Sequence, residues 1–207
     1  MLSILMTIWL VHVAAMVSPG PNFLLVSQLA ASDRGRSAGF AALGVTLGAL
    51  VWVTAAVLGI NAVFKLFPGL RLVLQLIGGM YLLYVAVRLW RSNGPDLKRV
   101  VTRVPNAAAF RLGLLTNITN PKSALFFGSV FAACFPPAPS SLLQLCVVVM
   151  IVANALCWHM LLAWMFSRPR VRAAYARVRT TANRVASAAV GALGLGLLVA
   201  TVRQARA

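Results

Sequence analysis

The stretch Met16-Val17-Ser18-Pro19-Gly20-Pro21-Asn22-Phe23-Leu24-Leu25-Val26 decides how this sequence can fold. It places two prolines, a glycine and an asparagine in the middle of an otherwise apolar run. Because proline lacks a backbone donor and its ring clashes with the preceding turn, a regular helix cannot continue through it. A single proline would only kink the helix, whereas two prolines around a glycine favour a real interruption. The freed carbonyl groups then need a protein or water partner, because hydrocarbon offers none.

The composition is that of a membrane protein. Of 207 residues, 61% are hydrophobic and 10% are charged, whereas a soluble domain averages roughly 45–50% and about 25%. Three uncharged runs each exceed the ~20 residues that cross a bilayer, and they are Leu2–Ala31, Ala38–Phe64 and Leu142–Ser167. The formal charge of +17 would suggest nucleic acid in a soluble protein. Here the basic residues lie mainly between apolar runs, so we expect no nucleic-acid partner.

The apolar runs predict an all-α, polytopic membrane protein with one domain over residues 1–207. The six expected spans are about 3–31, 38–64, 70–90, 110–135, 142–167 and 185–202. Three spans in each half is an odd number, so the two halves would be oppositely oriented, as inverted three-helix repeats. The first repeat would cover about 3–90 and the second about 110–203, with a basic cytoplasmic loop at 91–110 between them.

The charge distribution predicts the orientation. Most of the 19 Lys and Arg residues follow spans one, three and five, which places these loops in the cytoplasm and both termini outside, on the periplasmic side. We interpret the segment Pro169–Arg184 as a basic loop that sets this topology. The alternative is an amphipathic helix that binds anionic lipid or a partner.

A second interruption lies in span four, at Asn117-Ile118-Thr119-Asn120-Pro121-Lys122. Paired Gly/Pro interruptions at corresponding positions of two halves indicate a transporter site. Each break also resembles a fresh helix start, with Asn120 as the N-cap and Pro121 as the first helical residue. The stretches that lead from the cytoplasm to the two breaks have equal length, and at ~1.5 Å per residue both breaks lie roughly 15 Å deep.

These breaks predict a binding site for a small carboxylate. A helix N-terminus carries unsatisfied N–H groups and a partial positive charge, which suit an anion. Lys122 would cost about 2.5–3.5 kcal/mol at membrane depth, so we interpret it as a cation for the carboxylate. The alternative is a lysine that only binds loose carbonyl groups at the break. The predicted substrate-binding residues are Ser18, Pro19, Gly20, Pro21, Asn22, Asn117, Asn120, Pro121 and Lys122.

With these motifs, the sequence resembles the LysE/RhtB family of bacterial amino-acid exporters. The resemblance covers the whole chain and is carried by Ser18-Pro19-Gly20-Pro21-Asn22, by Gly35-Arg36-x-x-Gly39-x-x-x-x-Gly44-x-x-x-Gly48, and by Asn117-x-x-Asn120-Pro121-Lys122. It implies a secondary transporter of the bacterial inner membrane that exports amino acids or their derivatives, driven by the proton gradient, without ATP or another cofactor. The chain departs from many relatives at Ala49, where they carry an acidic or polar residue.

The proton carrier is left open by the sequence. The candidates are Asp33, at the cytoplasmic end of span one, and His159 in span five, whose side chain titrates near neutral pH. Asp33 is alternatively a loop cap, and His159 a buried histidine with satisfied hydrogen bonds. His12 is a weaker candidate. A further route is that the zwitterionic substrate itself carries the coupling charge.

Other classes fit the sequence less well. A membrane-embedded enzyme would need paired carboxylates, a metal cluster or a nucleophile–histidine pair, and an exporter of a metal ion would usually show His-, Cys- or Asp-rich loops. We therefore expect no catalytic residues and no metal site. The expected partners are a small amino-acid substrate and membrane lipid, and the glycine-rich helix faces would allow a homodimer.

Overall fold

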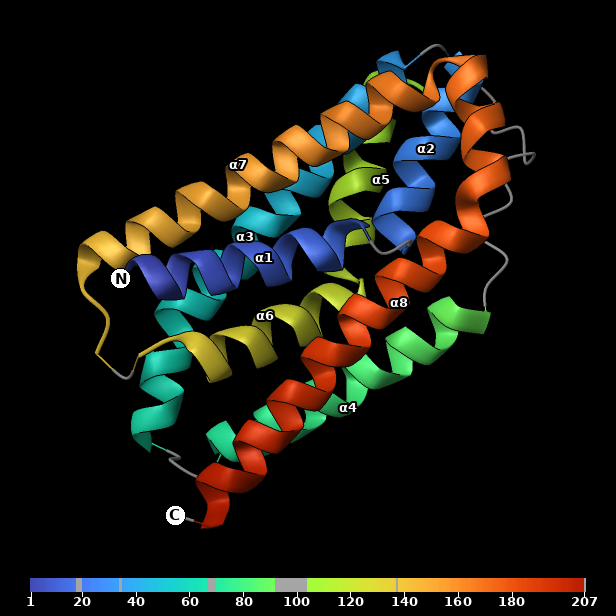
Figure 1. The fold of residues 1–207 in the computed structure, drawn as a ribbon. Coiled ribbons are helices and arrows are strands. Elements are labelled where there is room, and N and C mark those ends of the chain that lie inside the picture. The colour runs from blue at the N-terminus through green and yellow to red at the C-terminus, as the bar shows by residue number, and fades with distance from the viewer. Residues whose placement is uncertain (18–19, 34, 67–69, 92–103, 137, 207) are drawn as a thin grey trace.

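The structure is a computed structural model that describes residues 1–17, 20–33, 35–66, 70–91, 104–136 and 138–206. These parts of the chain form α-helices and no strand, which confirms the all-α prediction. The helices are α1 (Leu2–Val17), α2 (Pro21–Asp33), α3 (Arg36–Leu66), α4 (Leu70–Arg91), α5 (Asn106–Ile118), α6 (Pro121–Cys134), α7 (Ser141–Phe166) and α8 (Pro169–Arg206). Figure 1 shows α1 and α6 between α7 on one side and the α4–α8 pair on the other.

Both predicted interruptions separate helices. Helix α1 ends at Val17 and α2 begins at Pro21, and their axes differ by 53°. Helix α5 ends at Ile118 and α6 begins at Pro121. The Asn120 side chain accepts a hydrogen bond from the Lys122 N–H at 3.0 Å, which confirms it as the N-cap of α6. The two breaks therefore follow the local rules of proline and N-cap chemistry.

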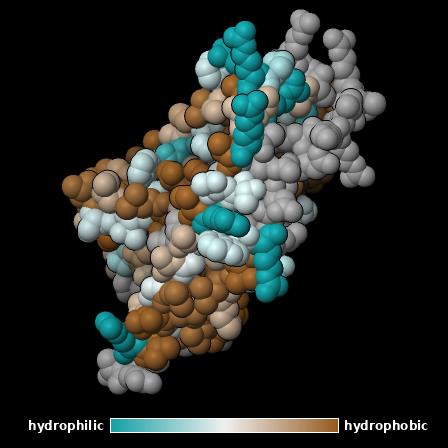
Figure 2. All heavy atoms as spheres, turned by 45° about the vertical axis from the view of Figure 1, so that its right-hand side comes forward, coloured by the Kyte–Doolittle hydropathy of each residue, from teal (hydrophilic) through white to brown (hydrophobic). Residues whose placement is uncertain are grey.

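Two described helices, Arg36–Gly59 and Ser141–Phe166, are long and apolar enough to cross a membrane, and the bent pair α1–α2 would add a third. Figure 2 shows brown, hydrophobic side chains over much of the surface, with hydrophilic teal side chains gathered mainly toward the upper end. Exposed apolar side chains such as Leu58, Leu145 and Val149 contribute to this surface. An apolar exterior of this kind is expected where lipid is the solvent. The count of six spans stays a prediction.

The interpretation of Pro169–Arg184 as a loop is wrong for its secondary structure, and its role in setting the topology stays a prediction. The segment is the first part of α8, a helix that begins at Pro169 and continues to Arg206. Proline is favoured at the first helical position, and alanine and arginine are strong helix formers. The segment also has tertiary contacts, because Arg172 Nη1 donates to the Ala31 carbonyl at 2.9 Å and Tyr175 packs on Phe166 with ring centroids 5.1 Å apart. These contacts attach it to the C-terminal ends of α2 and α7.

Glycines set the closest helix contacts. A Cβ atom at Gly44 would collide with the Phe110 carbonyl, and one at Gly113 with the Ala41 carbonyl. Farther along, Gly48 lies against Asn117. Residue numbers thus rise together along both helices, so α3 and α5 run parallel at very short distance.

Helices α4 and α8 pack in the opposite sense. A Cβ at Gly79 would meet Leu198 at 2.6 Å, and one at Gly194 would meet Leu82 at 3.0 Å. The Ser187 hydroxyl donates to the Ala86 carbonyl at 2.7 Å. Numbers rise along α4 as they fall along α8, so this pair runs antiparallel.

Buried apolar side chains form two clusters, on either side of the helix breaks. Helices α3 and α7 contribute to both, since Val53 and Ile151 belong to the first and Val45 and Leu162 to the second. Helix α1 adds Ile8 to the first cluster, and α2 adds Val26, Leu29 and others to the second. The polar residues of the breaks therefore lie between two apolar cores.

Candidate functional site

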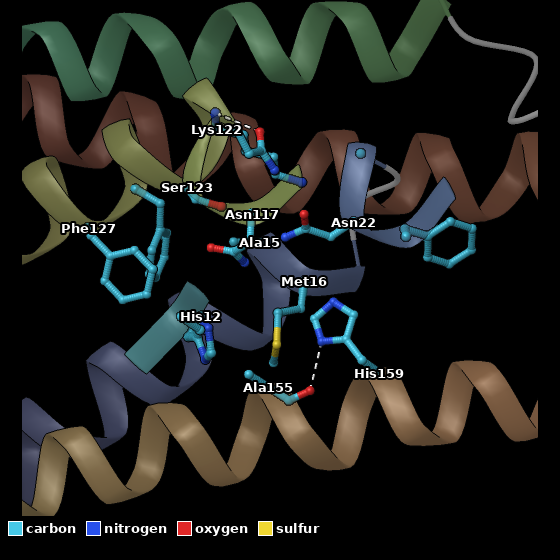
Figure 3. A pocket seen from close by; sticks show the side chains of 15 residues that line it. His12, Ala15, Met16, Asn22, Asn117, Lys122, Ser123, Phe127, Ala155 and His159 are labelled. Carbon is cyan, nitrogen blue, oxygen red and sulfur yellow. Dashed lines mark hydrogen bonds between the residues drawn. The ribbon is translucent and has the colours of Figure 1, made fainter. Parts of the chain in front are cut away.

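The two helix breaks line one cavity, of about 60 Å³. Five of the predicted substrate-binding residues contribute to its wall, and they are Gly20, Asn22, Asn117, Asn120 and Lys122. Figure 3 shows Asn22 and Asn117 facing each other across its centre, with Lys122 beyond them. A buried water needs roughly 10–15 Å³ of such space, so the cavity has room for several water molecules. Segments far apart in the sequence are thus brought together.

The other four predicted substrate-binding residues differ in their positions. Pro21 begins α2 and is exposed, and it is not among the residues of the cavity wall. Pro121 occupies the first helical position of α6, as predicted. Ser18 and Pro19 lie outside the described residues.

Ten further residues complete the wall, and they are His12, Ala15, Met16, Phe23, Ala49, Ser123, Phe126, Phe127, Ala155 and His159. Ser123, Phe126 and Phe127 of α6 were not among the residues predicted from the sequence. Their spacing carries the signal, because Ser123 and Phe126 follow Asn120 at intervals of three and so share one helix face. Ala49 also faces the cavity, where its small side chain leaves space.

The α6 end of the cavity is a helix N-terminus. Asn120 is buried, and its side-chain oxygen occupies the N–H of Lys122. The next residue, Ser123, lines the cavity. N–H groups of a first helical turn lack partners within the helix and carry the positive end of its dipole. The geometry of this helix end therefore suits a small anion, and Lys122 belongs to the same wall.

Asn117 is held in the cavity wall by two neighbours. Its carbonyl accepts a hydrogen bond from Trp52 Nε1 at 3.2 Å. A Cβ atom at Gly48 would lie 2.7–2.9 Å from the Asn117 side chain, so only glycine leaves space for this amide. Gly48 therefore also shapes the site, because the missing side chain at this position leaves the space that the Asn117 amide occupies.

Three buried polar atoms around the cavity have no hydrogen-bond partner in the described part of the protein. They are Asn117 Oδ1, Asn22 Oδ1 and His12 Nδ1. A buried polar atom without a hydrogen bond costs about 1–3 kcal/mol. Water or a bound ligand would supply the missing partners, and both amide oxygens would accept from a donor such as an ammonium group.

The two proton-coupling candidates are placed very differently. His159 is buried in the wall, where its Nδ1 donates to the Ala155 carbonyl at 2.7 Å. Asp33 is the last residue of α2, which begins at Pro21 beside the cavity. At ~1.5 Å per residue this puts it roughly 18 Å from the start of the helix. The side chain of Asp33 lies outside the described part. His12, the weaker candidate, lines the cavity opposite α6, with its ring centroid 5.4 Å from that of Phe126.

Comparison with known proteins identifies the family. Residues 13–201 match the LysE type translocator family. The threonine efflux protein of Escherichia coli K12 is 30% identical over 96% of this chain and 99% of its own length. The leucine efflux protein of Salmonella choleraesuis is 34% identical over 116 residues, which cover 55% of this chain and 54% of that protein. No solved structure matches the chain. Since the family match spans nearly the whole sequence, this chain belongs to the LysE family of membrane translocators, an amino-acid efflux family.

Proposed function

We propose that this protein exports a small amino acid, with threonine as the first candidate, across the bacterial inner membrane in exchange for protons. The observation that carries the proposal is the single cavity lined by both helix breaks. The full-length similarity to a threonine efflux protein selects the candidate substrate. No chemistry on the substrate is required, so the protein acts as a transporter and not as an enzyme.

The substrate carboxylate would lie at the N-terminus of α6. There it meets the dipole of α6 and the ammonium group of Lys122, and both stabilise negative charge. Lys122 belongs to the cavity wall together with Asn120 and Ser123. Away from bulk water, these interactions are stronger than they would be in solution.

The substrate ammonium group would lie between Asn22 and Asn117. Their side-chain oxygens are buried at the cavity and have no hydrogen-bond partner among the described residues, and an ammonium group supplies three donors. A hydrogen bond to a charged group contributes about 1.5–3 kcal/mol. A zwitterion therefore satisfies both ends of the cavity, which an amine or a carboxylic acid alone does not.

We further propose the six-span, inverted-repeat arrangement with both termini in the periplasm. Alternating spans require α3 and α5 to run parallel and α4 and α8 antiparallel, as the glycine contacts indicate. An arrangement of this kind brings the two breaks to one level near the midplane.

The test is transport by purified protein in proteoliposomes. Labelled threonine should accumulate when a proton gradient is imposed, and Lys122→Gln should abolish accumulation while Lys122→Arg retains part of it. Arg170→Gln is the matched control, because it removes a cation from an exposed position at the start of α8. Absence of transport for threonine, leucine and all other amino acids in a panel would refute the proposal. Wild-type rates in Lys122→Gln would refute the role of the lysine.

A further inference from the structure

We propose that the coupling proton of this transporter is carried by a histidine pair, His12 and His159, in the wall of the substrate cavity. This inference rests on the proposed export function. It differs from the sequence prediction in two ways, since it adds His12 and does not involve Asp33.

The first observation is that both histidines lie in the wall of one cavity. The chain contains two histidines, and they come from different halves of the sequence, on α1 and α7. Both are buried, with 5% and 4% of their surface exposed, and both line the same cavity as the helix breaks. Figure 3 shows the two imidazoles on one side of the cavity and Lys122 on the other, with Asn22 and Asn117 between them. A bound zwitterion would therefore lie directly between the lysine and the histidines.

The second observation is the hydrogen bond of His159. Because the Ala155 carbonyl can only accept, the proton of that bond belongs to Nδ1. The other ring nitrogen, Nε2, is then an acceptor in the neutral side chain and a donor after protonation. Figure 3 shows this nitrogen pointing away from Ala155 and into the cavity. His159 can thus gain and lose a proton at Nε2 while its hydrogen bond and ring position stay unchanged.

The third observation is the environment of His12. Its Nδ1 has no hydrogen-bond partner among the described residues, so it is free to bind water or a proton. The ring packs against Phe126 and Phe127 of α6, with centroid distances of 5.4 and 6.3 Å. The Phe126 ring lies within the roughly 6 Å over which an aromatic ring can attract a cation.

The charges around His12 and His159 explain why the proton and the substrate would be transported in opposite directions. In the described part of the chain, the titratable groups in the cavity wall are His12, His159 and Lys122, and all three are bases. A protonated histidine and the substrate ammonium would repel each other strongly in a site with little water. Proton and amino acid therefore exclude one another, as antiport requires. The proton enters from the periplasmic side as the substrate leaves, and it is released to the cytoplasm before the next substrate binds.

The test separates coupling from substrate binding. Proteoliposomes are assayed twice, for net threonine uptake driven by a proton gradient and for counterflow, the exchange of labelled for unlabelled threonine without a gradient. The variant is His12→Gln combined with His159→Asn, because the asparagine amide can still donate to the Ala155 carbonyl. We expect the ratio of net uptake to counterflow to fall by about tenfold or more, and we expect counterflow to lose its dependence on pH.

The matched control is Trp9→Phe. It removes the hydrogen bond from Trp9 Nε1 to Asn154 Oδ1, which also joins α1 to α7 but lies outside the cavity wall. This variant should keep both activities. If the double variant does not fold, each single variant is measured in the same two assays.

Two outcomes would overturn the inference. One is net uptake in the folded variant that still follows the proton gradient, and the other is equal loss of net uptake and counterflow, which would make the histidines substrate ligands. Absence of counterflow in the wild-type protein would instead contradict the proposed export function.

Discussion

Substitution of Gly48 by alanine tests the cavity most directly, because α3 offers two matched glycines. The added Cβ would lie 2.7–2.9 Å from Cβ, Cγ and Oδ1 of Asn117, closer than real Cβ atoms approach other heavy atoms. The contacts with Cγ and Oδ1 are relieved when this amide turns, because its Oδ1 has no hydrogen-bond partner among the described residues, whereas the contact with Cβ requires α3 and α5 to separate slightly. We therefore expect Gly48→Ala to fold with the Asn117 amide displaced from the cavity.

The size of the effect follows from the lost interaction. Overpacking lowers the free energy of unfolding by about 1–3 kcal/mol. Replacing a helical glycine by alanine raises it by roughly 0.5–1 kcal/mol. Stability should therefore fall by at most about 2.5 kcal/mol. Losing one hydrogen bond to the substrate ammonium costs about 1.5–3 kcal/mol. At about 1.4 kcal/mol per factor of ten, the threonine concentration for half-maximal counterflow should rise roughly ten- to a hundredfold.

The two other glycines bracket this result. A Cβ at Gly39 meets no atom within 4 Å, so Gly39→Ala should transport normally. A Cβ at Gly44 would collide with the backbone of Phe110, which cannot turn away, so Gly44→Ala should lose folded protein. Counterflow kinetics and thermal unfolding in detergent measure both properties. Unchanged threonine affinity in Gly48→Ala, or equal damage from Gly39→Ala, would refute the reasoning.

Three further predictions concern the breaks and the topology. Asn120→Ala should lower stability by about 0.5–2 kcal/mol through loss of the N-cap, and Asn120→Asp should restore much of it; thermal unfolding of both variants decides, and equal stability would contradict the cap. Trp52→Phe should lower the free energy of unfolding by about 0.5–1.5 kcal/mol and weaken threonine binding, since the Asn117 carbonyl loses its donor. Wild-type stability and threonine affinity in this variant would show that the hydrogen bond does not position Asn117. Reporter fusions at the two termini should both show a periplasmic location, and a cytoplasmic signal from one terminus would exclude an even number of spans.

Local chemistry made part of the site predictable. The prolines at positions 19, 21 and 121 favour a helix break for a local reason, because the missing donor and the clash with the preceding turn belong to the residue itself. Asn120 caps α6 for an equally local reason, since its side chain reaches an N–H two residues away. These features needed no knowledge of distant segments, and the structure confirms the helix ends that they predict.

The remaining features depend on partners far away along the chain. The segment after Pro169 is helical and docks through Arg172 and Tyr175 onto helices that its own sequence does not specify. Gly48 creates the position of Asn117 only because α3 and α5 are in contact. The amino-acid sequence by itself determined the apolar helices, the two breaks and the cap, all of which follow from backbone chemistry within a few residues. Only the tertiary structure decided that His12, His159, Asn22, Asn117 and Lys122 share one cavity, because helix packing sets the distances between them.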